Sequence, residues 1–398
     1  MAAIHPSYHA STSSTPLVQY ATLNGHSHPA EHIKRTKILL LGLRRSGKTS
    51  IHQVLFDNLS PKQTFYLEST MRIVKHIVDT VIPLEIWDTP GNVTVETLGT
   101  PFSQFSALVF VIDIRDLYNQ PISKLVDFIV AAYHANPSIS FEVFVHKAEK
   151  LQEEDKIENF RQIHERVSDR LLDISPVYEQ VQLNFHLTSV YDHSLHAAFS
   201  RVLHKLIEPL PYLEEMLNVF CTNSQSPKAF LFDVNSRLYV ATDAAPVDSA
   251  THNLCCDYLR MLNSFGPLYR SATCTPLRRH KPIPAISPSN TNSDLALSTP
   301  STSSTSQIAS PIQTHGHSVY SESSQKDLFY PSAATSLHPS TPGTTLTYHL
   351  VTPQLALLAL LPSTVYENRR GLIEYNVVFF REGIQEICKA ENESRGGG

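Results

Sequence analysis

Apolar runs and amphipathic stretches alternate along residues 36–208. Short apolar runs predict strands, and stretches with apolar residues three and four positions apart predict helices. The predicted strands are 37–42, 72–79, 82–88, 106–113, 140–146 and 182–188, and the predicted helices are 48–59, 121–135, 155–172 and 195–207. This alternation favours an α/β domain with a mainly parallel sheet and helices on both faces. Because only a few residues separate 72–79 from 82–88, we expect a hairpin that places one antiparallel strand at the edge.

A second, smaller pattern follows Pro209 and Pro211, which we expect to end the first domain. Its predicted elements are a hairpin of 229–233 and 238–242, a helix at 249–264, strands at 345–351 and 355–361, and an amphipathic helix at 371–389. These elements favour a small α+β domain over 209–270 and 344–390. So small a sheet leaves a face or an edge to cover, which favours dimerisation.

Three segments have no hydrophobic periodicity, namely 1–35, 271–343 and 391–398. The first two are rich in Ser, Thr and Pro, so we expect a disordered tail and a long disordered insertion, with a second short tail at the end. The insertion contains Ser-Pro and Thr-Pro pairs such as Ser287-Pro288. Two roles for it stay open, a passive linker and a segment that recruits partners after phosphorylation.

The composition narrows the possible surroundings. A net charge of −5 gives no reason to expect nucleic acid or an anionic membrane as a partner. Five cysteines without a C-x-x-C pair favour a reduced, cytosolic protein. No apolar run reaches the roughly 18 residues of a membrane helix, and we identify no lipidation signal. We therefore expect a cytoplasmic protein that does not insert into a membrane and reaches one only through partners.

The loop Gly42–Thr49 reads G-L-R-R-S-G-K-T and lies between a predicted strand and a predicted helix. This is the G-x-x-x-x-G-K-[ST] phosphate-binding pattern in its required context. The glycines let backbone N–H groups wrap a polyphosphate, the lysine reaches its outer phosphates, and the threonine hydroxyl ligates Mg²⁺. The candidate phosphate-binding residues are Arg44, Arg45, Ser46, Gly47, Lys48, Thr49 and Ser50.

Two later segments add candidate Mg²⁺ and γ-phosphate contacts. Strand 82–88 ends in Asp88, and Gly91 follows three residues later. An aspartate at the end of a neighbouring strand can hold Mg²⁺, and the glycine N–H can meet the γ-phosphate. Thr70 lies in a loop before the predicted edge strand, where its hydroxyl can close onto Mg²⁺ while the γ-phosphate is present.

Two strand ends have residue types suited to reading a guanine base. His146-Lys147-Ala148-Glu149 follows strand 140–146 and looks like the base-reading N-K-x-D element of GTPases. Its carboxylate would accept hydrogen bonds from two guanine donors that adenine lacks. Ser189 and Val190 follow strand 182–188 and would place backbone N–H groups near guanine O6.

Taken together, these motifs resemble the Rag GTPases, of the RagC/RagD type and its fungal counterpart. The resemblance rests on the loop at 41–50, Leu67–Thr70, Ile86–Asp88, Phe141–Lys147 and Leu187–Ser194. It continues downstream in Lys228–Val234, Ala241–Asp243, Pro246–Asp248, Leu254–Asp257 and Gly371–Asn376. It covers roughly 36–270 and 344–390.

The resemblance implies a Ras-like P-loop GTPase domain over 36–208, followed by a small roadblock/longin-like dimerisation domain. It implies GTP or GDP with Mg²⁺ as cofactors, Thr49, Thr70 and Asp88 at the metal, and Lys48, Thr70, Gly91 and Asn92 in catalysis. It also implies a heterodimer with a RagA/RagB-type GTPase and a GTPase-activating protein. A membrane scaffold complex would hold the pair on the vacuolar or lysosomal membrane, where it would relay amino-acid availability to the TOR kinase complex.

The sequence departs from the family pattern at a few positions. Glu149 stands where the family has Asp, and the segment from Gly91 to Phe102 is shorter. Asn92 stands where a Gln would orient the attacking water, so we expect slow intrinsic hydrolysis.

Three classes of function were compared on these residues. A guanine-nucleotide switch is favoured by the complete set of Lys48, Thr49, Thr70 and Asp88. A scaffold subunit with a degenerate nucleotide pocket, acting by heterodimerisation, is the alternative that Glu149 and Asn92 favour. An ATP-using kinase or ATPase would need a second acidic cluster or lid arginines, which we do not identify in the sequence.

Overall fold

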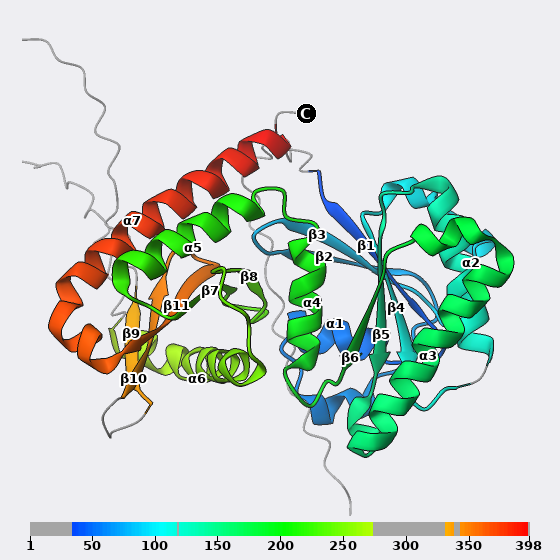
Figure 1. Cartoon of the computed structure of the whole chain (residues 1–398), viewed down its shortest axis with the longest axis horizontal. Helices are drawn as coiled ribbons and strands as arrows, with labels where there is room; N and C mark the ends of the chain where they lie inside the picture. Colours follow the sequence, from blue (N-terminus) through cyan, green and yellow to red (C-terminus); the bar gives the residue numbers. More distant parts are fainter. Residues whose placement is uncertain (1–33, 118, 274–330, 338–342, 397–398) are drawn as a thin grey trace, which may run out of the picture.

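The computed structural model of the 398-residue chain describes residues 34–117, 119–273, 331–337 and 343–396. Within these residues the chain forms two sheets, each with helices on both faces (Figure 1). The predicted conformations of 1–33, most of the insertion (274–330 and 338–342) and 397–398 lie outside the described residues.

The first sheet has six strands in the order β2-β3-β1-β4-β5-β6. Its strands are β1 (Thr36–Gly42), β2 (Val74–Asp79), β3 (Pro83–Asp88), β4 (Ala107–Asp113), β5 (Ser140–His146) and β6 (Leu183–Thr188). All neighbouring pairs are parallel except β2 and β3, which are antiparallel. The predicted mixed sheet with one antiparallel edge strand is therefore confirmed.

Four helices cover this sheet, two on each face. The elements are α1 (Lys48–Phe56), α2 (Asn119–Ala135), α3 (Glu153–Ile174) and α4 (Ser194–His204). Helices α1 and α4 pack on the face that carries Ile38 and Leu40, whereas α2 and α3 pack on the face that carries Leu39 and Leu41. Successive β1 residues thus enter different cores, as the alternation of side chains along a strand requires.

Short 3-10 turns connect the elements of this domain, and the strand ends shape one edge of the sheet. The turns are η1 (Pro61–Tyr66), η2 (Glu96–Leu98), η3 (Phe102–Gln104), η4 (Ala148–Lys150) and η5 (Pro176–Gln180). Because β1, β3, β4, β5 and β6 run parallel, their carboxyl ends meet at one edge. The register there pairs Leu40 with Asp88 and His146 with both Asp113 and Thr188. This register brings polar residues that are distant in sequence to one edge.

The second sheet is antiparallel with the strand order β8-β7-β11-β10-β9. Its strands are β7 (Lys228–Asp233), β8 (Tyr239–Thr242), β9 (Ser332–Ser336), β10 (Thr344–Leu350) and β11 (Leu355–Pro362), and its helices are α5 (Leu210–Ser224), α6 (Ser249–Thr273) and α7 (Ser363–Gly396). Helices α5 and α7 lie side by side on one face, and α6 lies on the other (Figure 1).

Helix α5 was missed by the sequence analysis, which placed only a domain end at Pro209 and Pro211. Pro209 is the N-cap and Pro211 lies in the first helical turn, where a missing backbone N–H costs no intrahelical bond. Leu213, Leu217 and Phe220, spaced four and three residues apart, then bury one face against the sheet. The prolines therefore begin this helix.

Strand β9 and the ends of α6 and α7 also differ from the expectation of disorder. Ser332–Ser336, inside the predicted insertion, pairs along β10, although its small polar residues carry no periodic signal. Helix α6 reaches Thr273, and α7 continues through the predicted tail to Gly396 with a kink at Arg369. Near that end Arg395 pairs with Glu391 at 2.6 Å and donates to Thr36 Oγ1 at 3.2 Å. Contacts between residues distant in the sequence thus order segments whose local composition predicted disorder.

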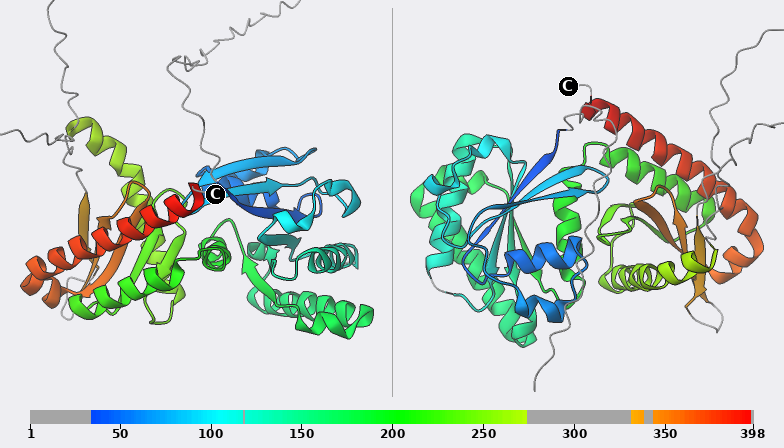
Figure 2. Two further views of the ribbon diagram at one scale, coloured as in Figure 1. Left: turned by 90° about the horizontal axis from the view of Figure 1, so that it is seen from above. Right: turned by 180° about the vertical axis from the view of Figure 1, so that it is seen from behind.

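The two sheets share one continuous hydrophobic cluster, which runs from β1 and α4 into α5, β7 and α7. Helix α4 faces β8 directly: Tyr239 N donates to Ser200 Oγ at 3.0 Å, and His204 Nε2 lies 3.2 Å from Tyr239 O. Figure 2 shows α4 between the two sheets from above and from behind. The outer edge of β8 is therefore occupied by the first domain.

No helix in the described ranges combines the length and the apolar character needed to cross a membrane.

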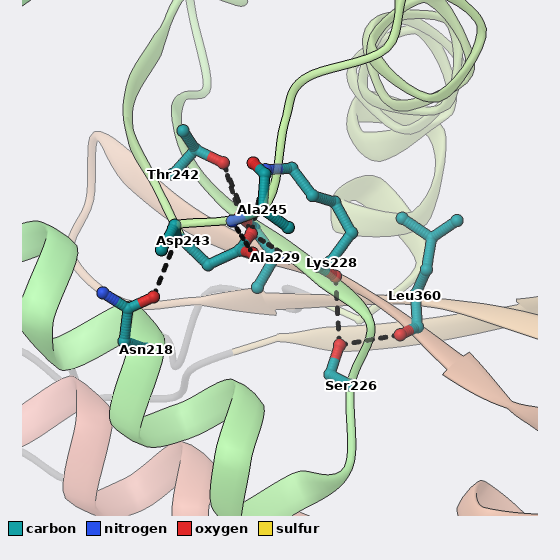
Figure 3. Close-up of polar contacts among 9 residues, drawn as sticks. Asn218, Ser226, Lys228, Ala229, Thr242, Asp243, Ala245 and Leu360 are labelled. Carbon is teal, nitrogen blue, oxygen red and sulfur yellow. Dashed lines mark hydrogen bonds and ion pairs between the residues drawn. The ribbon is translucent and has the colours of Figure 1, made fainter.

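A buried ion pair joins β7 to the end of β8 (Figure 3). Lys228 Nζ lies 3.0 Å from Asp243 Oδ1, and the two residues are 6% and 7% exposed. Lys228 Nζ also donates to Ala245 O at 2.5 Å. The Asp243 carboxylate accepts from the N–H groups of Ala229 and Ala245 at 3.0 and 2.9 Å. Both charges are thus satisfied by partners inside the fold.

We expect Asp243→Asn to lower the free energy of unfolding by roughly 3–5 kcal/mol, because it leaves the Lys228 ammonium buried without a countercharge. Urea unfolding followed by circular dichroism measures the change. Glu374→Gln is the matched control, because it removes an exposed ion pair with Arg370, and we expect it to leave the unfolding midpoint unchanged. Equal midpoints for Asp243→Asn and the wild type would contradict the structural role of the pair.

Candidate functional site

The candidate site is built around the loop between β1 and α1. Gly47 has φ 114°, and a Cβ on it would lie 2.6 Å from His146 Cδ2, so only glycine fits there. A Cβ on Gly91 would lie 2.3 Å from Arg44 N, which shows how closely the loop after β3 approaches the first loop. The loop wraps toward the positive end of α1, which favours an anion at this point.

Lys48 lies inside this loop and is 6% exposed. Its Nζ donates to the carbonyl oxygens of Gly42 and Leu43 at 3.0 and 2.9 Å. Burial lowers the pKa of Lys48 to about 8, although the nearby Asp88 carboxylate opposes the shift. The ammonium is thus desolvated among neutral carbonyls with only Asp88 acting against the effect of burial, and a phosphate group would add further negative charge.

Three oxygen-bearing side chains converge beside Lys48. Thr49 Oγ1 lies 2.7 Å from Asp88 Oδ2, Thr70 Oγ1 lies 3.0 Å from the same oxygen, and the two hydroxyls are 2.8 Å apart. Asp88 is 1% exposed, and its Oδ1 is buried without a hydrogen-bond partner in the described structure. The three predicted metal residues therefore lie together, although they come from α1, the η1–β2 loop and the end of β3.

The chemistry of these donors fits Mg²⁺, which prefers carboxylate and hydroxyl oxygens and retains several waters. Among the described residues, no group of three or more His, Cys, Asp and Glu side chains is placed to hold a metal. The two threonine hydroxyls are thus necessary to this donor set. Thr49, Thr70 and Asp88 would hold the ion, which would neutralise charge on bound phosphates.

Of the residues that follow β3, Gly91 is held by a hydrogen bond, Asn92 is exposed and Val93 is buried. Gly91 O accepts from Lys124 Nζ of α2 at 2.7 Å, which fixes the loop beside the first one. Asn92 follows in the same turn and is exposed to solvent. Val93 then returns to the core at 4% exposure. The structure therefore anchors Gly91 and leaves the Asn92 side chain in solvent.

Lys147 joins the end of β5 to the phosphate-binding loop. It adopts a left-handed backbone with φ 64°, and its Nζ donates to Arg45 O at 2.5 Å and to Asp113 Oδ2 at 3.0 Å. The preceding residue, His146, is 1% exposed, with Nδ1 3.0 Å from Thr188 Oγ1. Burial lowers the pKa of His146 to about 3, so its ring is neutral and packs beneath Gly47.

Glu149 of η4 contacts Ser189, which follows β6. Ser189 Oγ donates to Glu149 Oε2 at 2.7 Å and accepts from Tyr191 N at 3.0 Å. Val190 is buried in the core shared with α4. The two predicted base-reading segments are therefore brought together by a side-chain hydrogen bond.

The remaining predicted phosphate-loop residues take different positions. Ser46 is 3% exposed, and its Oγ has no hydrogen-bond partner in the described structure. Arg44 Nε lies 3.4 Å from Ser69 Oγ, in the loop that carries Thr70. Arg45 is exposed, and Ser50 is half-buried in the first turn of α1.

Asp113 and Arg115 were missed by the sequence analysis. They line a cavity of about 380 Å³ together with Arg45 and Lys147. Burial alone would raise the pKa of Asp113, but hydrogen bonds from Arg115 and Lys147 lower it to about 2. The signal that identifies Asp113 is its place at the carboxyl end of β4, opposite His146.

Comparison with known proteins assigns this geometry to a family. Residues 37–259 match the family model described as the Gtr1/RagA G protein conserved region. GTP-binding protein gtr2 of Schizosaccharomyces pombe is 43% identical over 249 residues, which cover 61% of this chain and 79% of that protein. Ras-related GTP-binding protein C of Homo sapiens is 43% identical over 241 residues, which cover 59% of this chain and 60% of that protein.

A more distant relative and one solved structure complete the comparison. Ras-related GTP-binding protein A of Dictyostelium discoideum is 25% identical over 228 residues, covering 55% of this chain and 73% of that protein. The crystal structure of a bacterial selenocysteine-specific elongation factor, EF-Sec, aligns with TM-score 0.32 and 19% identity, covering 50% of this chain and 32% of that one. At that score the structural likeness carries no argument.

We expect Lys48→Met to weaken GTP and GDP binding by at least about tenfold, because hydrogen bonds to charged groups contribute roughly 1.5–3 kcal/mol. Equilibrium titration with a fluorescent guanine nucleotide measures the change. Lys150→Met is the control, since this lysine is exposed on η4 and should bind like the wild type. Unchanged affinity in Lys48→Met would place the phosphates elsewhere.

Proposed function

The chain belongs to the Rag GTPase family, of the RagC type, and from that premise we propose that it is a guanine-nucleotide switch within a Rag-type heterodimer. The observation that carries this proposal is the meeting of Thr49, Thr70 and Asp88 beside Lys48. Thr70 belongs to a surface loop, and in this arrangement of the loop its hydroxyl reaches the buried Asp88. Its contact therefore links loop order to an Mg²⁺-bound γ-phosphate.

Guanine selectivity in this proposal rests on Glu149. Its carboxylate is oriented by Ser189 Oγ, and each carboxylate oxygen has lone pairs for more than one donor. The carboxylate can therefore accept from guanine N1–H and the 2-amino group while Ser189 holds it. The longer Glu side chain, in place of Asp, is accommodated by this serine contact.

We expect Glu149→Gln to weaken GTP and GDP binding and to strengthen XTP binding. Xanthine replaces the 2-amino donor with a carbonyl acceptor, which the Gln amide can satisfy and the carboxylate cannot. Titration of wild type and variant with GTP, GDP, XTP and ATP, with and without Mg²⁺, measures the selectivity. Glu154→Gln on the exposed start of α3 is the control. Weak or unselective wild-type binding would refute guanine recognition and favour the scaffold alternative.

Hydrolysis in the proposed switch is slow without a GTPase-activating protein. A residue that orients the attacking water must reach the γ-phosphate, and the Asn92 side chain is short and exposed to solvent. Asn92 also favours the scaffold alternative. In that alternative, hydrolysis and nucleotide exchange have no effect on partner binding, and the chain acts mainly through heterodimerisation.

The second domain is, in this proposal, the roadblock/longin-like dimerisation domain implied by the sequence resemblance. It has the element order α5–β7–β8–α6–β9–β10–β11–α7. Of its two edge strands, β8 is covered by α4. Natural edge strands often carry charged residues or proline, which prevent pairing with another strand. Strand β9 contains neither. We therefore assign the RagA/RagB-type partner to the β9 edge.

We expect Ala334→Lys to weaken heterodimer formation, because it places a charge at the exposed centre of the β9 edge. Co-purification with the partner and analytical ultracentrifugation measure association. Gln152→Lys, which adds the same charge at an exposed position before α3, should associate normally. Equal association of both variants would move the interface to another surface.

The wider role follows the same premise. The proposed heterodimer is cytoplasmic and lies on the vacuolar or lysosomal membrane through a scaffold complex, where it relays amino-acid availability to the TOR kinase complex. This role is supported by the similarity to RagC-type proteins, which covers at most 61% of this chain. The assignment of partners is therefore a proposal for this chain.

A further inference from the structure

A cavity of about 650 Å³ lies between the two domains. Its walls come from the segment after α1, the loop that leads into α4, the β7–β8 turn and the outer side of α6. Pockets that bind small molecules have volumes of about 300–1,000 Å³. None of the residues assigned above to phosphate or Mg²⁺ binding lines this cavity.

Arg237 gives this cavity a cationic wall. It follows the β7–β8 turn with φ 58°, a left-handed conformation that is uncommon for a residue with a side chain. Its Nε is buried without a hydrogen-bond partner in the described structure, whereas the side chain as a whole is half-buried and feels the charge of Asp257 across the cavity. Burial lowers the pKa of Arg237. A buried donor without an acceptor is unfavourable, so an anion at this wall of the cavity would give Arg237 Nε the acceptor it lacks.

His196 faces the same cavity from the first turns of α4. It is 4% exposed, and neither of its ring nitrogens has a hydrogen-bond partner in the described structure. Burial lowers the pKa of His196 well below its usual range, so the ring is neutral and offers one N–H donor. A buried donor without a partner is unfavourable, and a ligand oxygen would supply the missing partner.

The acidic residues of the cavity are exposed and already engaged. Asp257 Oδ1 lies 3.0 Å from His193 Nε2. Asp192 Oδ1 accepts from Ser194 N at 2.9 Å. The unpartnered groups, Arg237 and His196, are thus both able to donate hydrogen bonds, while the carboxylates stand at the solvent side. The inner part of the cavity is suited to an anion.

We propose that this interdomain cavity binds a small-molecule anion through a carboxylate or phosphate group, held by Arg237 and His196. The bound molecule contacts both domains at once. It also touches Val190 and Tyr191, which follow Ser189, and the segment Asn58–Pro61, which leads toward the Thr70 loop. Occupancy would therefore stabilise one arrangement of the two domains. The proposal stands on the cavity residues and does not depend on which nucleotide the other site binds.

The test uses the full chain saturated with GDP and Mg²⁺, so that the phosphate-binding loop is filled. Inorganic phosphate and citrate are titrated separately at constant ionic strength, with thermal unfolding and calorimetry as readouts. We expect a saturable rise in melting temperature with at least one probe. A response to phosphate alone identifies a phosphate ligand, and a response to citrate alone identifies a carboxylate ligand. No saturable response to either probe overturns the proposal.

Arg237→Gln separates a binding role from a structural one. We expect it to weaken probe binding at least about tenfold while leaving the melting temperature without probe close to that of the wild type, because the Nε donor that is removed makes no hydrogen bond in the described structure. Arg170→Gln, on the exposed side of α3, should respond like the wild type. A large loss of stability without probe would mark Arg237 as structural and overturn the proposal.

Two further variants keep the outcome decisive. His196→Leu removes the second donor and is expected to weaken probe binding severalfold even if Arg237→Gln does not fold. Lys48→Met identifies phosphate bound in the other site. Binding that survives in Arg237→Gln and His196→Leu but disappears in Lys48→Met overturns the interdomain site, and it also shows that GDP had not filled the loop.

Discussion

The hydrogen bonds that Asp88 accepts from Thr49 and Thr70 are the contact on which the candidate switch depends. They exist because β3 pairs beside β1, with Leu40 opposite Asp88. Thr89 reinforces this end of the strand, since its N–H and hydroxyl both donate to Leu40 O, at 3.3 and 2.8 Å. One carboxylate on a rigid strand end thus holds one residue of the phosphate-binding loop and one of a surface loop. The phosphate-binding loop and the Thr70 loop therefore depend on the same carboxylate.

Helix α4 connects this site to the second domain. The loop before it carries Ser189 and Val190, its first turns carry His196, and its later turns carry Ser200 and His204, which face β8. Because α4 packs on the first sheet and against β8, it cannot shift without altering both contacts. The helix thus connects the loop of Ser189 and Val190 physically to the interdomain cavity and to the second sheet. The exposed β9 edge lies at the opposite side of that sheet.

Those parts of the fold that depend on local residue patterns could be predicted from the sequence. The apolar run at 107–112 predicted β4, and the Gly42–Thr49 spacing predicted the loop between β1 and α1. The sequence analysis missed α5 because two prolines suggest a break until their place in the first turn is known. It missed β9 because Ser, Ala and Thr alone carry no periodic signal, and the order of this strand comes from β10. Asp113 escaped notice because its partner Lys147 is 34 residues away and meets it only through strand register.

The substitution of Glu for Asp at position 149 illustrates how a motif and its surroundings act together. Glu149 is the middle residue of η4, whose N-cap is the left-handed Lys147, so the contacts of that lysine help to fix where η4 begins. Its extra methylene would give the carboxylate more freedom, which would reduce selectivity. Ser189 removes part of that freedom by donating to Oε2, and Ser189 is itself fixed by Tyr191 N. The proposed base recognition would therefore depend on the β6–α4 loop as much as on Glu149, and this loop forms a wall of the interdomain cavity.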